Sequence, residues 1–139
     1  MKPKFRAWDK RFSEFVEDFF VSEDGKIYKK TKDTSYGIAI SRETSDKIIL
    51  MQSTGLFDRN GKEIFEGDIV KTTRFFGRAD EIGGFYEYEK ELVGIVKVLE
   101  AAWVIDTGSD AMHLWTEIEE NEVVGNIYEH PDYLKKRGN

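Results

Sequence analysis

One segment of the sequence carries the side chains that proteins use to bind nucleic acids or other proteins. Arginine and phenylalanine interleave over residues 74–78, and three more aromatic residues follow a Gly-Gly pair. Aromatic rings stack on bases while arginine neutralises phosphate, and the same residue types are enriched at protein interfaces. This chemistry is binding rather than bond-breaking. The candidate interaction residues are Arg74, Phe75, Phe76, Arg78, Phe85, Tyr86 and Tyr88.

Acidic residues in the same segment bear on the kind of partner. Five acidic side chains lie between residues 80 and 91, and they would repel a phosphate backbone. A protein interface is therefore the stronger interpretation. Three alternatives stay open: a homo-oligomer built by exchange of this segment, a nucleic-acid-binding module, and an acidic mimic of nucleic acid that uses residues 80–91 and 117–122.

Groups suited to catalysis are scarce. The chain has no cysteine and two histidines, His113 and His130, each expected to be solvated or hydrogen-bonded rather than catalytic. No serine lies in a Gly-x-Ser-x-Gly turn, and Gly83-Gly84 lacks the Lys-Ser/Thr of a phosphate-binding loop. The sequence predicts a protein that is not an enzyme and binds no cofactor.

Two acidic patterns bear on metal binding. Asp58-x-Asn60-Gly61 is similar to the start of a calcium loop, but the later ligands are missing and a turn explains it better. We expect no metal site. An acidic run, more often a solvated surface than a cation site, consists of Glu117, Glu119, Glu120 and Glu122.

Charge and composition limit the setting. Of the 139 residues, 40% are hydrophobic, which is enough for a core, and the net charge is −6. Residues 1–47 hold 11 basic and 9 acidic side chains, which leaves 10 basic and 18 acidic for the rest. No apolar run suits a signal peptide or a membrane span, and the lack of cysteine fits a reducing compartment. We expect a cytoplasmic protein with no membrane contact.

The elements that position these residues are mostly strands. Residues 5–8 predict a short strand, and apolar runs around Asp24-Gly25 predict a hairpin over residues 19–29. A helical stripe of aromatic residues allows at most a short helix before that hairpin. Residues 30–47 are polar and predict a connection with room for one edge strand. An N-terminal α+β or hairpin region over residues 1–47 follows.

Residues 48–139 predict a second, mainly β domain. An apolar run at 48–51 predicts a strand, and a turn follows in which Gly61 can adopt positive φ. Five further strand-like segments follow, and a long loop, residues 73–91, is expected between the first two of them. Five short strands are typical of a small SH3-like barrel, and they are expected at 64–72, 92–99, 103–106, 112–115 and 123–128.

Three separated segments carry a family resemblance. They are FRAWD at 5–9, LMQSTGL at 50–56 running into DRNGKEIFEGDIV at 58–70, and VGNIYE at 124–129. In this order and spacing the chain resembles the YopX family of phage and prophage proteins. The resemblance implies a phage or prophage origin and a small barrel-like C-terminal part, and it brings no established reaction. The expected function is that of a non-enzymatic accessory protein that acts through a protein partner or through self-assembly.

Residues of those segments have structural explanations. Gly67 relieves backbone strain where the first barrel strand begins, and Asp68 accepts hydrogen bonds from nearby amides. Trp8 is expected as a core anchor, and Gly55 and Gly125 as backbone positions that tolerate no Cβ atom.

Overall fold

A computed structural model describes residues 4–79, 81–114 and 120–136. Its contacts divide the chain into two compact units, one of Arg6–Leu50 and one of Met1–Phe5 together with Met51–Asn139. The chain thus passes between the units after Phe5 and again after Leu50. The division after residue 47, drawn from composition alone, stays a prediction.

The unit that holds residues 6–50 is made of short antiparallel strands. The hairpin over 19–29 is confirmed, because Val21 lies opposite Ile27 and Gly25 turns the chain with φ of 83°. The second and third strands of a three-stranded sheet, order β3-β4-β5, form another hairpin where a connection with room for one edge strand was expected, and β5 lies at the edge of that sheet. The strands are β1 (Phe5–Asp9), β2 (Glu14–Phe15), β3 (Phe19–Val21), β4 (Ile27–Thr34) and β5 (Gly37–Glu43).

The short helix that the sequence allows before the hairpin does not form. Residues 12–18 instead form turns, irregular chain and the two-residue strand β2, which pairs with β1. Ser13 and Asp18 both have φ of 52°, a left-handed conformation that interrupts a right-handed helix. The aromatic spacing therefore reflects packing: Phe15 meets Trp8 edge-on, with ring centroids 4.9 Å apart. Trp8 is buried, as expected of a core anchor.

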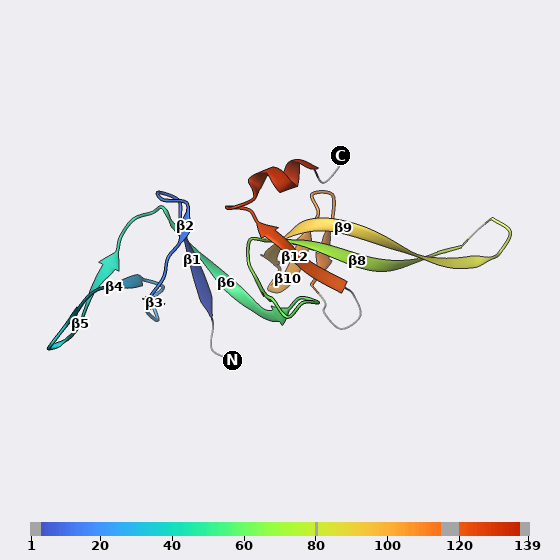
Figure 1. Ribbon diagram of the computed structural model, residues 1–139. Coiled ribbons are helices and arrows are strands. Elements are labelled where there is room, and N and C mark those ends of the chain that lie inside the picture. Colours follow the sequence, from blue (N-terminus) through green and yellow to red (C-terminus); the bar gives the residue numbers. More distant parts are fainter. Residues whose placement is uncertain (1–3, 80, 115–119, 137–139) are drawn as a thin grey trace. The chain divides into compact units, whose positions relative to one another are not determined.

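The other unit contains a five-stranded antiparallel sheet, order β11-β10-β9-β8-β12 (Figure 1). Strands β6 and β7 precede it and belong to a sheet of order β2-β1-β6-β7. The elements are β6 (Ile48–Phe57), β7 (Glu63–Phe65), β8 (Asp68–Ala79), β9 (Phe85–Leu99), β10 (Ala102–Asp106), β11 (Ala111–His113), β12 (Glu120–Asn126) and the 3₁₀ helix η1 (Pro131–Lys136).

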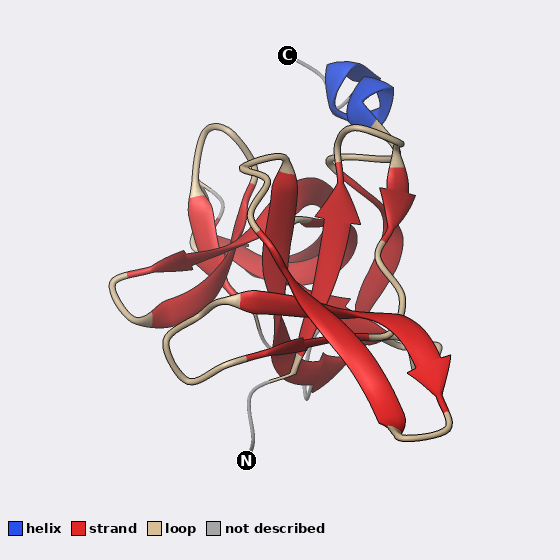
Figure 2. Cartoon of the chain, turned by 90° about the vertical axis from the view of Figure 1, so that its left-hand side faces the viewer, coloured by secondary structure: helices blue, strands red, loops and turns tan. Residues whose placement is uncertain are grey.

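The prediction of a mainly β protein is confirmed, and Figure 2 shows strands almost throughout, with one short helix. Within the described residues, that helix is the 3₁₀ turn at the end of the described chain, so no α-helix accompanies the N-terminal hairpins. Strands occur in each of the five expected C-terminal segments. Closure of those strands into an SH3-like barrel stays a prediction, since β11 and β12 lie at the two edges of their sheet. No described helix is long and apolar enough to cross a membrane.

The long loop expected at 73–91 is wrong. Its two sides are the outer halves of β8 and β9, which pair without a break from Ile69 opposite Ile95 to Ala79 opposite Phe85. Figure 1 shows this hairpin extending beyond the rest of its sheet. Glycines and charges in the segment are typical of loops, and no core-facing apolar pattern marks its strands. These two strand segments are therefore held by pairing with each other, and the sequence shows no alternation of apolar and polar residues that would predict them.

The core that fixes the base of the hairpin is aliphatic. Strands β7, β8, β9 and β10 each contribute one residue, and the residue directly after β11 is the fifth. Each is at most 5% exposed. Leu56, Trp103 and Val123 pack against them. Burying such side chains stabilises the fold by about 1.5–3 kcal/mol each. The cluster consists of Ile64, Val70, Val96, Ile105 and Leu114.

The turn before β7 is closed by hydrogen bonds to the Asp58 carboxylate. Its carboxylate accepts hydrogen bonds from the backbone N–H groups of Asn60, Lys62 and, at 2.9 Å, Val123 of β12. Burial acts to raise the pKa of Asp58, but the three N–H donors outweigh it and lower the pKa below its ordinary value. Gly61 has φ of 82°, so the turn interpretation is confirmed.

The start of β8 is built as the sequence predicts. Gly67 has φ of 87°, and the buried Asp68 carboxylate accepts the N–H of Phe65 at 2.8 Å. A Cβ on Gly67 would lie 3.2 Å from the Met51 sulfur. These contacts hold the first residues of the hairpin strand against the core.

Candidate interaction surface on the β8–β9 hairpin

Arg74 anchors the hairpin and is not part of its exposed surface. It is 8% exposed, and its guanidinium donates to the carbonyl of His113 at 2.7 Å and to the Thr72 hydroxyl at 3.3 Å. His113 ends β11, which is three strands away from β8 in the sheet order. A direct bond across that separation requires the sheet to curl. Arg74 thus serves the fold, and the exposed aromatic residues lie farther out.

Beyond Arg74 the register sorts the residues onto two faces, because directly opposed residues of an antiparallel pair share a face. One face, here called the tyrosine face, carries Tyr86, Tyr88 and Lys90. The opposite glutamate face carries Phe75, Phe85, Glu87, Glu89 and Glu91.

Two candidate residues are described only through their backbone. Phe76 lies opposite Tyr88 and Arg78 opposite Tyr86, at register positions of the tyrosine face. Their side chains lie outside the described part of the structure. The sequence-predicted set is therefore divided into Arg74 at the base, four exposed aromatics on two faces, and these two backbone positions.

Aromatic rings are exposed on both faces. Exposed fractions are 61% for Phe75, 69% for Phe85, 47% for Tyr86 and 41% for Tyr88. The Tyr86 and Tyr88 rings lie side by side, 6.2 Å apart and tilted by 43°. Soluble proteins rarely leave such rings together in water unless they bind something.

Gly77 gives the Phe85 ring a place on the glutamate face. A Cβ on Gly77 would lie 2.4 Å from the tip of that ring, so the ring can approach the strand this closely only where the residue is glycine. An aromatic ring that covers a strand glycine in this way supports the pairing of the two strands. Phe85 is nonetheless exposed to solvent on its outer side.

The two faces differ in charge. The glutamate face has three carboxylates and, over residues 73–79 and 85–91, no basic residue. At its base, the Lys71 ammonium lies 4.0 Å from the Glu91 carboxylate. The tyrosine face has Lys90 and, at register positions, Arg74 and Arg78, with no acidic residue. Counting the charges of the whole segment does not show this separation. If residues 85–91 (FYEYEKE) are read as a strand, the glutamates alternate with the tyrosines and Lys90 and so fall on the opposite face.

The other predicted chemical groups have structural partners. His130 accepts the backbone N–H of Asn126 on Nδ1 at 3.2 Å, which confirms a hydrogen-bonded histidine. A Cβ on Gly125 would lie 2.6 Å from that same nitrogen, as expected of a position that tolerates no side chain. Gly55 has φ of 78°.

The predicted acidic run is only partly described, since Glu117 and Glu119 lie outside the described residues. Glu120 lies 3.5 Å from Arg59, and Glu122 is opposite Lys71 in the pairing of β12 with β8. Within the described ranges, no three histidine, aspartate or glutamate side chains are placed to hold a metal ion.

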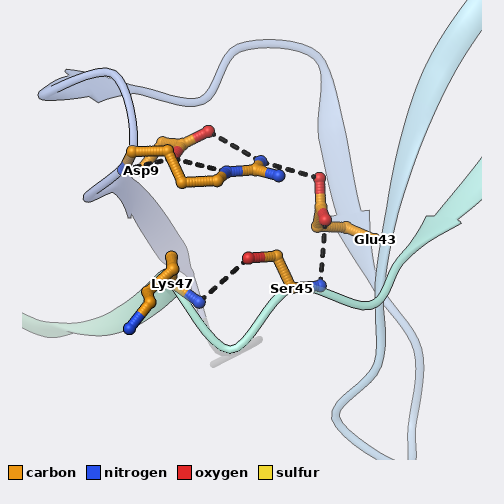
Figure 3. A network of polar contacts seen from close by, with 5 residues as sticks. Asp9, Glu43, Ser45 and Lys47 are labelled. Atoms are coloured by element: carbon orange, nitrogen blue, oxygen red, sulfur yellow. Dashed lines mark hydrogen bonds and ion pairs between the residues drawn. The ribbon is translucent and has the colours of Figure 1, made fainter.

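A second polar network, missed by sequence reasoning, lies in the unit of residues 6–50 (Figure 3). Arg11 donates to both carboxylate oxygens of the buried Asp9, at 3.0 and 2.9 Å, and to Glu43 at 3.2 Å. The Arg11 hydrogen bond lowers the pKa of Asp9, and the N–H of Ser45 lowers that of Glu43. These contacts join the end of β1 to the end of β5, and all of them serve the fold.

Comparison with known proteins supports one family. The family profile described as YopX protein matches residues 4–135. Protein EF1440 from Enterococcus faecalis has a TM-score of 0.55 and 23% identity, covering 96% of this chain and 99% of that chain. YopX from Bacillus subtilis has a TM-score of 0.56 and 20% identity, covering 92% and 94%. These structures share the fold, and the comparison with curated proteins gives no match. The chain belongs to the YopX family.

Proposed function

We propose that this chain is a phage or prophage accessory protein that works in the cytoplasm and acts by binding a protein partner, without chemistry of its own. The observation that carries the proposal is the outer half of the β8–β9 hairpin, which presents exposed aromatic rings on both faces. Beyond Thr73, β8 and β9 have hydrogen-bonded strand neighbours only in each other, among the described residues, until β10 joins at Ile95. A partner can therefore reach this part of the hairpin.

The energetics favour a partner over an inert surface. Burying about 100 Å² of apolar surface on one of these rings contributes roughly 2.5 kcal/mol. The two rings of one face supply roughly 5 kcal/mol, and a partner that covers both faces gains roughly 10 kcal/mol, before the entropy of association is subtracted. A partner that covers both faces can therefore form a specific but moderate complex. Tyrosine also adds a hydroxyl that can hydrogen-bond at the rim of an interface.

The experiment is to remove the outer hairpin without disturbing its base. Residues 75–89 are replaced by Ser-Gly-Gly-Ser, which keeps the register pair of Arg74 and Lys90. Affinity capture from host lysate compares this variant with wild type and with Tyr36→Ser, a fully exposed aromatic in the other unit. A partner held by wild type and Tyr36→Ser but lost by the shortened chain supports the proposal. The same bound proteins with all three chains would refute it.

A second function, binding of single-stranded nucleic acid, is favoured by one observation. Three of the five acidic residues that argued against it, Glu87, Glu89 and Glu91, lie on the glutamate face, so the paired part of the tyrosine face combines aromatic rings and cations without acids. Because Arg74 is buried, the informative substitution is Lys90→Ala, which should weaken binding of a labelled oligonucleotide and reduce its salt dependence.

The third predicted function, an acidic mimic of nucleic acid, would use Glu87, Glu89 and Glu91, whose side chains point to one face. Of its other predicted segment, residues 117–122, the first three residues lie outside the described part of the chain. Competition with DNA for a basic host protein, lost on reversal of those three charges, would support it.

A further inference from the structure

The two faces of the hairpin are complementary to each other. Both present aromatic rings, and they carry opposite charge: Glu87, Glu89 and Glu91 on one side, Lys90 among the tyrosines on the other. A single chain cannot bring its own two faces together, because the ribbon lies between them. Two chains can.

We propose that the tyrosine face of one hairpin docks on the glutamate face of a second copy of this chain. The inference rests on the proposed function and names its partner. Alternate residues on a strand are about 6.8 Å apart, so each face offers a regular row of side chains. Two copies have the same strand twist, and twisted sheets of equal hand stack face to face at about 10 Å.

Other arrangements of two hairpins are less favourable. If two tyrosine faces meet, Lys90 of one copy approaches Lys90 of the other. If two glutamate faces meet, the three carboxylates of one copy oppose the three carboxylates of the other. Edge-to-edge pairing would extend the ribbon, but charged side chains at alternate positions of β9 work against it. Unlike charges meet only when the two different faces meet.

The size of the face sets the strength of the contact. The seven residues 73–79 and their partners form a ribbon about 24 Å long and two strands wide, or roughly 240 Å² of flat area. A stable interface buries about 800 Å² on each partner, so this docking is weak and depends on concentration. Because each copy uses a different face, a free face remains at each end and association continues beyond two copies unless a ring closes.

The experiment is sedimentation velocity at increasing concentration in low salt, with two charge-reversal variants. Lys90→Glu reverses the tyrosine face, and Glu87→Lys with Glu89→Lys reverses the glutamate face. Wild type is expected to show a weight-average mass that rises above the monomer value of 16.2 kDa with concentration. Each variant alone should associate roughly tenfold more weakly, and their equimolar mixture should recover association, because the reversed faces attract one another.

The controls are charge changes outside the hairpin. Lys62→Glu and Glu100→Lys alter exposed residues outside the hairpin and should sediment like wild type. Matching thermal midpoints for all variants show that folding is retained.

Failure of this inference is distinct from failure of the proposed function. Wild type that stays monomeric, or association that neither reversal weakens, overturns docking on a second copy. If the shortened hairpin then still loses a captured protein, the partner is a different protein and the proposed function stands. A monomer whose Lys90→Glu variant loses a single-stranded oligonucleotide also overturns the inference, in favour of nucleic acid on the tyrosine face.

Discussion

Substitution of Arg74 separates a structural role from a binding role. Its guanidinium is buried and donates to the His113 carbonyl at 2.7 Å and the Thr72 hydroxyl at 3.3 Å. A hydrogen bond from a charged donor contributes about 1.5–3 kcal/mol, and the Arg74→Ala variant also loses the packing of the side-chain stem. We expect Arg74→Ala to lower the free energy of unfolding by about 3 kcal/mol, or the melting temperature by roughly 10 °C.

The assay is thermal unfolding followed by tryptophan fluorescence, since the chain has three tryptophans. Arg74→Lys should fall between wild type and alanine, because an ammonium cannot reproduce the planar donor. Lys90→Ala is the matched control: it changes the exposed residue opposite Arg74 and should shift stability by less than about 0.5 kcal/mol. A melting temperature of Arg74→Ala equal to that of wild type would refute the claim that this arginine holds the curled sheet.

Three further predictions concern single positions. Because the pKa of Asp58 is lowered in the folded chain, its stabilising effect is fully present above the unfolded value of 3.8 and is lost as pH falls through the folded pKa. Acid unfolding of Asp58→Asn should therefore depend less on pH below 5 than that of wild type, and parallel titrations would disprove this. Gly77→Val must displace the Phe85 ring, so it should weaken partner docking about tenfold while the melting temperature falls by less than about 4 °C, as binding and melting assays measure. Gly125→Ala should destabilise by about 1–2 kcal/mol through its clash with His130, and less than that when His130→Ala is already present; equal costs in both backgrounds would exclude the clash.

Most strands could be predicted from the sequence where an apolar run is followed or preceded by residues typical of a turn. Asp24-Gly25 and Gly61 mark turns whose φ values require glycine, and the structure has both. The outer hairpin could not be found in this way, because neither of its faces is buried and a strand without a buried face has no apolar period. The hairpin of β4 and β5 was predicted only as one edge strand for a related reason, since its sequence is mostly polar.

The candidate site was predicted in its residue types but not in its arrangement. Interleaved arginine and aromatic residues lie in the segment that projects from the sheet, and their role in binding a partner stays a prediction. Burial of Arg74 depends on His113, which is 39 residues away in the sequence, and no local pattern reports such a contact. Separation of charges onto two faces follows from the pairing register, which a loop does not have.

The bond from Asp58 to the N–H of Val123 has a consequence for the order of folding. These residues are 65 positions apart, and β12 also covers the outer edge of β8 as far as Thr73. When residues up to 114 have emerged from the ribosome, β12 has not. The edge of β8 that pairs with β12 is then open, and Asp58 lacks the hydrogen bond from the N–H of Val123. Vectorial folding of this unit stops at an incomplete sheet until residue 126 has emerged, and chaperones that recognise open strand edges have their opportunity in that interval.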